Sequence, residues 1–156
     1  MANKTIIGKK FFQKGTVSVT DPCYDSFTWC RIDDLPIKEG TYVCSVVEED
    51  KGKWGKRVTS IWLEPDIGNL TLARNAYKRI GEIGVDAGHA GFFQNKPDYN
   101  DDEWDAFCDN MKPEENAWIV EEGFYSSSGY GDGCYPVYGV KNNRGEYIAL
   151  MIQFIN

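Results

Sequence analysis

Runs of β-branched and aromatic residues that alternate with polar residues constrain this chain more than any other feature. A period-two pattern places successive side chains on opposite faces of a strand. The segment RVTSIWLE, for example, sets Ser60 and Trp62 on one face against Ile61 and Leu63 on the other. Such runs predict strands at residues 16–20, 41–47, 57–64, 90–94, 117–126, 135–140 and 146–155.

The segments between these runs predict how the strands connect. Residues 49–55 and 141–145 contain glycine, and the second also contains two asparagines, so both are expected to form hairpin connections. Apolar residues at helical spacing predict a helix over 101–111, capped by an aspartate, and a second short helix over 70–80. We therefore expect one mainly β domain over residues 1–156, an antiparallel β-sandwich or half-open barrel with one or two short helices.

Charge and apolar content narrow the classes of partner. The 156-residue chain carries a net charge of −7, and a protein that follows a phosphate backbone needs a basic face. We therefore expect no long nucleic acid and no membrane as partners, and the chain has no apolar run of membrane-spanning length. The N-terminus lacks the apolar core of a signal peptide, and the cysteines number five. Reduced thiols in a cytoplasm are the expectation.

Three segments place an aspartate where an extended run gives way to Pro, Ala-Gly or Gly. They are VTDPCY, GVDAGHAG and GYGDGCY, which contain Asp21, Asp86 and Asp132. Ordinary turn chemistry accounts for such aspartates, because their side chains bond to the backbone two residues on. If the three instead converge in space, they could hold a hard cation, act as acid and base, or accept hydrogen bonds from a ligand. No recognised metal loop, phosphate loop or nucleophile motif accompanies them, and no cofactor is expected.

Other residues in these segments extend the candidate site. The single histidine, His89, stands between two glycines that would let a ligand approach closely. The stretch SSSGYGDGCYPVYG mixes tyrosine, serine and glycine as adaptable binding surfaces do. The candidate catalytic residues are Asp86, His89 and Asp132, and weak metal-ligand candidates are Asp21, Asp86 and Asp132. The candidate ligand-binding residues are Asp21, Tyr24, Asp86, Gly88, His89, Ser128, Tyr130, Gly131, Asp132, Gly133 and Tyr135.

The segments VDAGHAGFF, SSSGYGDGCYPVYG and NNRGEYIALMIQF together resemble the C-terminal half of an uncharacterised bacterial and phage family, domain of unknown function 4241. The front half is similar to its phage-encoded branch. The resemblance implies a site and no particular reaction. It places these residues at the signature positions of the family: Asp21, Asp86, Gly88, Ser128, Gly129, Gly131, Asp132, Gly133, Tyr135 and Pro136.

Three functions are consistent with these residues. The first is a non-catalytic phage accessory protein in the host cytoplasm that sequesters a small, nucleotide-derived metabolite or immune signal. Tyrosines would then stack on a base, and glycine amides would hold phosphate. The second is an Asp-dependent, metal-assisted hydrolase or phosphodiesterase. The third is a structural or interaction protein in which the three motifs are only turns, and homo-oligomerisation is left open.

Overall fold

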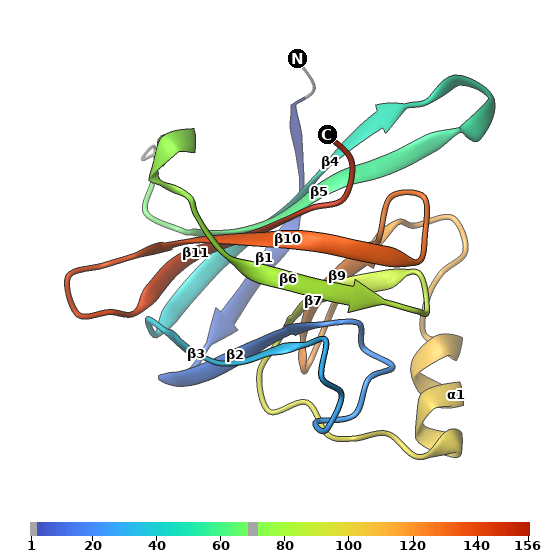
Figure 1. Cartoon of the computed structure of the whole chain (residues 1–156), viewed down its shortest axis with the longest axis horizontal. Helices are drawn as coiled ribbons and strands as arrows, with labels where there is room; N and C mark the ends of the chain where they lie inside the picture. The colour runs from blue at the N-terminus through green and yellow to red at the C-terminus, as the bar shows by residue number, and fades with distance from the viewer. Residues whose placement is uncertain (1–2, 69–71) are drawn as a thin grey trace.

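The computed structural model describes residues 3–68 and 72–156 (Figure 1). Its helical elements are α1 (Asp101–Asp109) and two short 3₁₀ turns, η1 (Gly52–Trp54) and η2 (Arg74–Ala76). None of the described helices is long and apolar enough to cross a membrane. The strands are β1 (Lys4–Phe12), β2 (Gly15–Thr20), β3 (Ile32–Ile37), β4 (Gly40–Asp50), β5 (Lys56–Pro65), β6 (Lys78–Val85), β7 (His89–Phe93), β8 (Ala117–Val120), β9 (Gly123–Ser127), β10 (Gly133–Lys141) and β11 (Tyr147–Gln153).

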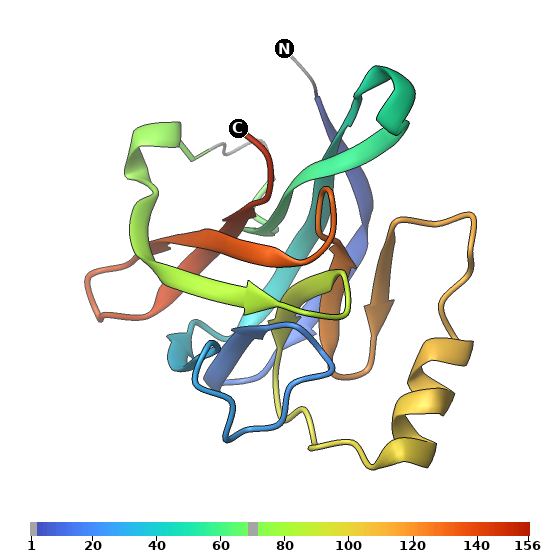
Figure 2. The same ribbon diagram turned by 45° about the vertical axis from the view of Figure 1, so that its right-hand side comes forward.

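All of these strands belong to one strongly curved sheet. The hydrogen-bonded path runs β1-β4-β5-β11-β3-β2-β7-β9-β8, while β10 pairs with both β11 and β6. Every ladder is antiparallel except the single parallel pair Tyr147–Ile37 between β11 and β3. Figures 1 and 2 show the resulting barrel-like wrap, with the β4–β5 hairpin projecting from it. The predicted mainly antiparallel, half-open β architecture is confirmed.

The barrel stays half open because β1 and β8, the two ends of the path, approach without forming a ladder. A Cβ atom at Gly8 would lie 2.8 Å from the Ile119 side chain, so the two strands touch at this point. Further along, the Lys10 ammonium donates to the backbone oxygen of Glu121 at 2.7 Å. Side-chain contacts rather than a backbone ladder therefore join β1 to the β8 edge.

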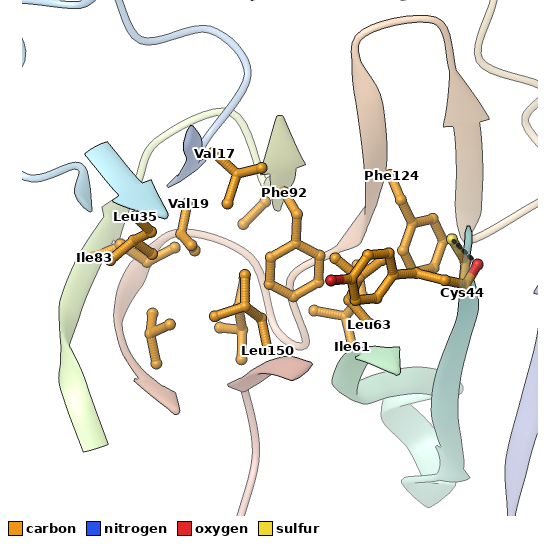
Figure 3. Packing of buried hydrophobic residues seen from close by; sticks show 14 of the residues in the cluster. Val17, Val19, Leu35, Cys44, Ile61, Leu63, Ile83, Phe92, Phe124 and Leu150 are labelled. Atoms are coloured by element: carbon orange, nitrogen blue, oxygen red, sulfur yellow. Dashed lines mark hydrogen bonds between the residues drawn. The ribbon is translucent and has the colours of Figure 1, made fainter. Parts of the chain in front are cut away.

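The interior of the barrel is filled by aliphatic and aromatic side chains from the alternating positions of nearly every strand (Figure 3). Phe92 and Phe124 are fully buried, and Ile61 and Leu150 reach the same core from the opposite wall. Burial of an aromatic or aliphatic side chain of this size contributes about 1.5–3 kcal/mol. This core fixes the register of the strands that carry the polar turns.

Helix α1 packs on the outside of β7, β8 and β9 through a second apolar cluster. Phe107 contacts Tyr125 on β9, with ring centroids 5.1 Å apart. The helix begins after Asn100, whose side chain accepts from the N–H of Glu103, while the Glu103 side chain accepts from the N–H of Asn100. The predicted helix is confirmed, although Asn100 rather than an aspartate caps it.

Two sequence predictions are wrong, and three strands were missed. The predicted helix at 70–80 is replaced by η2 and the start of β6, because the ladder of β6 with β10 outweighs a weak helical pattern; residues 70 and 71 lie outside the described residues. The predicted strand at 117–126 is two strands, β8 and β9, joined by a two-residue connection between Val120 and Gly123. Strands β1, β3 and β6 were not predicted at all.

Candidate functional site

Asp21 directly follows β2 and is fully buried. One carboxylate oxygen accepts from the N–H of Cys23 at 2.9 Å. The other accepts from the N–H groups of Asp86 and Ala87, at 2.7 and 2.6 Å, in the turn between β6 and β7. Both oxygens thus bind backbone donors, and the side chain ties the end of β2 to the next turn in space. Asp21 therefore stabilises the contact between these two turns and does not face solvent.

The β9–β10 loop is held by its own polar groups. The N–H of Gly131 donates to the Ser128 carbonyl at 2.9 Å, and the Ser128 hydroxyl donates to the Gly131 carbonyl at 2.8 Å. The Tyr135 hydroxyl donates to the same Gly131 oxygen at 2.6 Å. Ser128 also donates its N–H to the carbonyl of Gly88 at 3.1 Å, which joins this loop to the β6–β7 turn. Ser128, Gly131 and Tyr135 are therefore occupied in shaping the turn.

The three aspartate turns do meet at one end of the sheet, but their side chains differ in exposure. Gly133 pairs with Val85, so Asp132 and Asp86 flank the same end of the β6–β10 ladder, and both are exposed. Asp21 lies beneath them, buried. Among the described residues no three His, Cys, Asp or Glu side chains group so that they could hold a metal ion.

The remaining predicted residues divide between the surface and the interior. Gly133 is exposed, and Tyr130 is 55% exposed with the Arg57 guanidinium 5.8 Å from the centre of its ring. Gly88 takes a φ of 74°, which an L-residue rarely adopts. Tyr24 is half-buried, and burial raises the pKa of its hydroxyl.

His89, the first residue of β7, lies in the aromatic cluster beneath α1. Its ring centre is 5.6 Å from that of Trp118 and 6.1 Å from that of Tyr125, both edge-to-face. Burial lowers the pKa of His89, against a smaller opposing effect of the Asp21 charge. Its Nδ1 atom is buried without a hydrogen-bond partner among the described residues. The structure therefore places this ring among aromatic side chains.

A different group of residues, which the sequence analysis did not assign to a site, lines a cavity on the outer face of the sheet. This cavity, of about 690 Å³, lies between β5, η2 and the residues after β11. None of the predicted site residues lines it. Its wall consists of Lys4, Val47, Glu49, Thr59, Ser60, Trp62, Leu72, Arg74, Tyr77, Gln153, Ile155 and Asn156.

The wall of this cavity combines two aromatic rings with two cations. Trp62 and Tyr77 pack edge-to-face at 5.3 Å. The Lys4 ammonium is 3.8 Å and the Arg74 guanidinium 5.1 Å from the centre of the Trp62 ring. Both distances are within the range of cation–π attraction, so the positive charges stay beside the indole. We call these four residues the Trp62 cluster.

Hydrogen bonding fixes part of this cluster and leaves part unused. The Trp62 indole N–H donates to the Ser60 hydroxyl at 2.8 Å, and Arg74 donates to the Gln153 side chain at 3.1 Å. The Tyr77 hydroxyl is buried without a partner among the described residues, and burial raises its pKa, so it keeps its proton. A buried unpaired hydroxyl is costly, which marks it as a donor available to a bound molecule.

The sequence contained one signal of this cavity. The alternation in β5 placed Ser60 and Trp62 together on one face, and the structure confirms that this face packs separately from the barrel interior. Tyr77 lay in the predicted helix at 70–80, which does not form. Nothing near Lys4 or Arg74 in the sequence indicates that either residue contacts an indole ring.

Comparisons of the chain with protein-family models, curated proteins and solved structures return no match. The resemblance to domain of unknown function 4241 therefore stays a prediction from the sequence.

Proposed function

We propose that the protein binds a small anionic molecule with a flat apolar part, of the nucleotide-derived class, in the cavity of the Trp62 cluster. The observation that carries this proposal is the presence of two cations and two aromatic rings in the wall of one cavity of about 690 Å³. Pockets of this size accommodate a drug-sized ligand. Sequestration of a nucleotide-derived metabolite or immune signal is the biological role that we propose for it.

Charge supports an anionic ligand. The Lys4 ammonium is 3.0 Å from the Glu64 carboxylate, so this cation is already partly neutralised. Arg74 forms no ion pair among the described residues and donates only to the neutral Gln153 side chain. A guanidinium presents several donors in a fork that matches phosphate or carboxylate oxygens. Arg74 is therefore the group that we expect to bind the anion, with Lys4 adding charge beside it.

Shape and hydrogen bonding support a flat apolar part with polar edges. The rings of Trp62 and Tyr77 offer apolar surface, and Leu72 and Ile155 border it. The protonated Tyr77 hydroxyl can donate to an acceptor on the ligand, while Thr59 provides a second hydroxyl in the wall. A base or similar ring satisfies both requirements, since it presents a π face and hydrogen-bonding edges.

The composition of the wall supports binding without chemical change. Among its described residues Glu49 is the one acidic side chain, and its carboxylate lies 3.7 Å from the Lys51 ammonium. The wall contains neither histidine nor cysteine among the described residues, and the Thr59 and Ser60 hydroxyls bond to the Val47 carbonyl and the Trp62 indole N–H rather than to a base.

Isothermal titration calorimetry with ADP, ADP-ribose and a cyclic dinucleotide tests this proposal. We expect binding by the native chain and weakening by about 10- to 100-fold in Arg74→Ala, because a charged hydrogen bond contributes roughly 1.5–3 kcal/mol. Tyr77→Phe keeps the ring and removes the hydroxyl, so a smaller loss is expected. Mass spectrometry of the recovered ligand should show it intact.

Arg57→Ala is the matched control, because Arg57 also lies over an aromatic ring but outside the cavity, beside Tyr130. It should bind as the native chain does. Loss of binding in Arg57→Ala with no change in Arg74→Ala would move the site to the β9–β10 loop. Absence of heat with all three ligands would contradict the proposed ligand class.

A further inference from the structure

The connection between β2 and β3, residues 21–31, carries the two most exposed large apolar side chains of the described residues. Phe27 is 94% exposed and Trp29 is 90% exposed. Single exposed apolar residues are common, but two adjacent aromatic side chains in full contact with water are costly and mark interaction surfaces. Figures 1 and 2 both show this connection at the end of the molecule away from η2, and so away from the Trp62 cluster.

The backbone beside these aromatic residues is held by hydrogen bonds from Asp98, Lys96 and Arg31. Asp98 accepts from both the N–H and the hydroxyl of Ser26, at 2.7 and 2.8 Å. The Tyr24 carbonyl accepts from the Arg31 guanidinium at 2.8 Å and from the Lys96 ammonium at 3.3 Å. Phe27 and Trp29 are thus presented by an ordered segment. Such preorganisation lowers the entropic cost of binding.

The surface around the two aromatic side chains is acidic. Asp25, Asp33, Asp34 and Asp98 are exposed. The two nearby cations already have partners. The Arg31 side chain is only 5% exposed and pairs with Asp33 at 2.8 Å, and the Lys96 ammonium donates to the carbonyls of Tyr24 and Pro97. Hydrogen bonds from Ser26 hold the pKa of Asp98 below its usual value, so this carboxylate stays ionised.

A hollow of about 330 Å³ lies beside this connection. Its wall includes Ser26, which directly precedes Phe27, together with Arg31, Asp33, Asp34 and Lys96. Asp33 is already paired with Arg31. Asp34 forms no ion pair among the described residues, so it is the carboxylate at this hollow that can bind a lysine or arginine side chain from another molecule.

We propose that Phe27 and Trp29 anchor a protein partner whose surface is apolar and bordered by lysine or arginine. Charge complementarity selects this partner, because the acidic border repels an anionic bilayer and also repels the same surface of a second copy. Aromatic side chains at the centre of a contact, with charged groups around them, have the arrangement of an interaction hot spot. This docking surface does not depend on ligand binding at the Trp62 cluster.

Two synthetic peptides test the proposal. The basic probe is an amphipathic helix with leucines on one face and lysines along both borders; the acidic probe has glutamates in place of the lysines. Binding is measured by fluorescence anisotropy of the labelled peptides. We expect the basic probe to bind the native chain and the acidic probe not to bind. The double variant Phe27→Ser/Trp29→Ser should weaken binding by about tenfold or more.

The matched control is Phe11→Ser/Trp54→Ser, which removes one phenylalanine and one tryptophan that are 53% and 57% exposed elsewhere. It should bind the basic probe within about twofold of the native chain, and thermal melting should show both double variants folded. Asp25→Asn/Asp34→Asn, which leaves the Arg31–Asp33 ion pair intact, should weaken binding of the basic probe and remove part of its dependence on salt.

Four results would overturn the proposal. The first is failure of the native chain to bind the basic probe, and the second is unchanged binding in Phe27→Ser/Trp29→Ser. The third is binding to phosphatidylcholine vesicles that requires Phe27 and Trp29, which would assign the surface to a membrane. The fourth is a dimer in analytical ultracentrifugation that requires the same two residues, which would assign it to a second copy.

Discussion

Replacement of Asp21 by asparagine tests the role of its buried carboxylate. The native side chain accepts three backbone N–H bonds, from Cys23, Asp86 and Ala87, at 2.6–2.9 Å. Asparagine has nearly the same shape but offers one acceptor oxygen and an NH₂ group that accepts nothing. In Asp21→Asn at least one backbone N–H must therefore face another donor in a fully buried position.

The size of the effect follows from these three bonds. The lost bond costs about 1.5–3 kcal/mol, and each of the two remaining bonds loses about 1 kcal/mol when its acceptor becomes neutral. A neutral side chain is easier to bury than a charged one, which returns part of this loss. We therefore expect the free energy of unfolding to fall by about 2–4 kcal/mol, or roughly 5–15 °C in Tm for a chain of this size.

Urea denaturation followed by circular dichroism measures the difference. Asp132→Asn is the control, because Asp132 carries the same chemistry on an exposed turn and should change the free energy of unfolding by less than about 0.5 kcal/mol. The structural role of Asp21 is refuted if the free energy of unfolding of Asp21→Asn lies within about 1 kcal/mol of that of the native chain. It is also refuted if the control variant loses as much stability as Asp21→Asn.

Three other outcomes follow from the structure. Gly91→Ala should prevent stable folding, judged by circular dichroism, because its Cβ would overlap the Phe124 carbonyl; a native-like melt would contradict this. Burial lowers the folded-state pKa of His89, so the unfolded chain takes up the proton first and stability should fall as pH drops below about 6.5. An NMR titration of the folded chain that gives His89 a pKa above about 6.5 would contradict this expectation. Iodoacetamide should modify exposed Cys134 in the native chain, whereas Cys44, whose pKa burial raises to about 12, should react only after unfolding; mass spectrometry distinguishes the two.

The strands that could be predicted from the sequence carry a local signal of their own. In β5 the outward-facing Ser60 and Trp62 alternate with the interior Ile61 and Leu63, so the period of two is visible. Strand β11 is apolar on both faces and shows instead as a continuous apolar run after a turn. Strand β1 is mostly exposed and contains three lysines, and β3 contains Asp33, Asp34 and Pro36. Their extended conformation depends on the ladders with β4 and β2. Such pairing is a long-range property that local composition does not report.

The candidate site was predictable only in part, for a similar reason. The sequence indicated that the turns at Asp21, Asp86 and Asp132 are related, and the structure places the three turns at one end of the sheet. It could not indicate that Asp21 would bond backbone groups 65 and 66 residues away. Nor could it bring Lys4 and Arg74, far apart in the chain, to the same indole ring.

Structural and binding roles thus fall on different residues in this fold. The side chains of Asp21, Ser128 and Tyr135 bond to backbone groups of these turns, which uses their polar atoms and fixes the end of the sheet. The groups that the fold leaves without full partners lie elsewhere. Arg74 and the Tyr77 hydroxyl lie beside a cavity, and Phe27 and Trp29 are exposed on the hydrogen-bonded connection between β2 and β3. Because a ligand can gain only from groups that the fold has not already satisfied, these residues are where substitutions should alter binding while the turns alter stability.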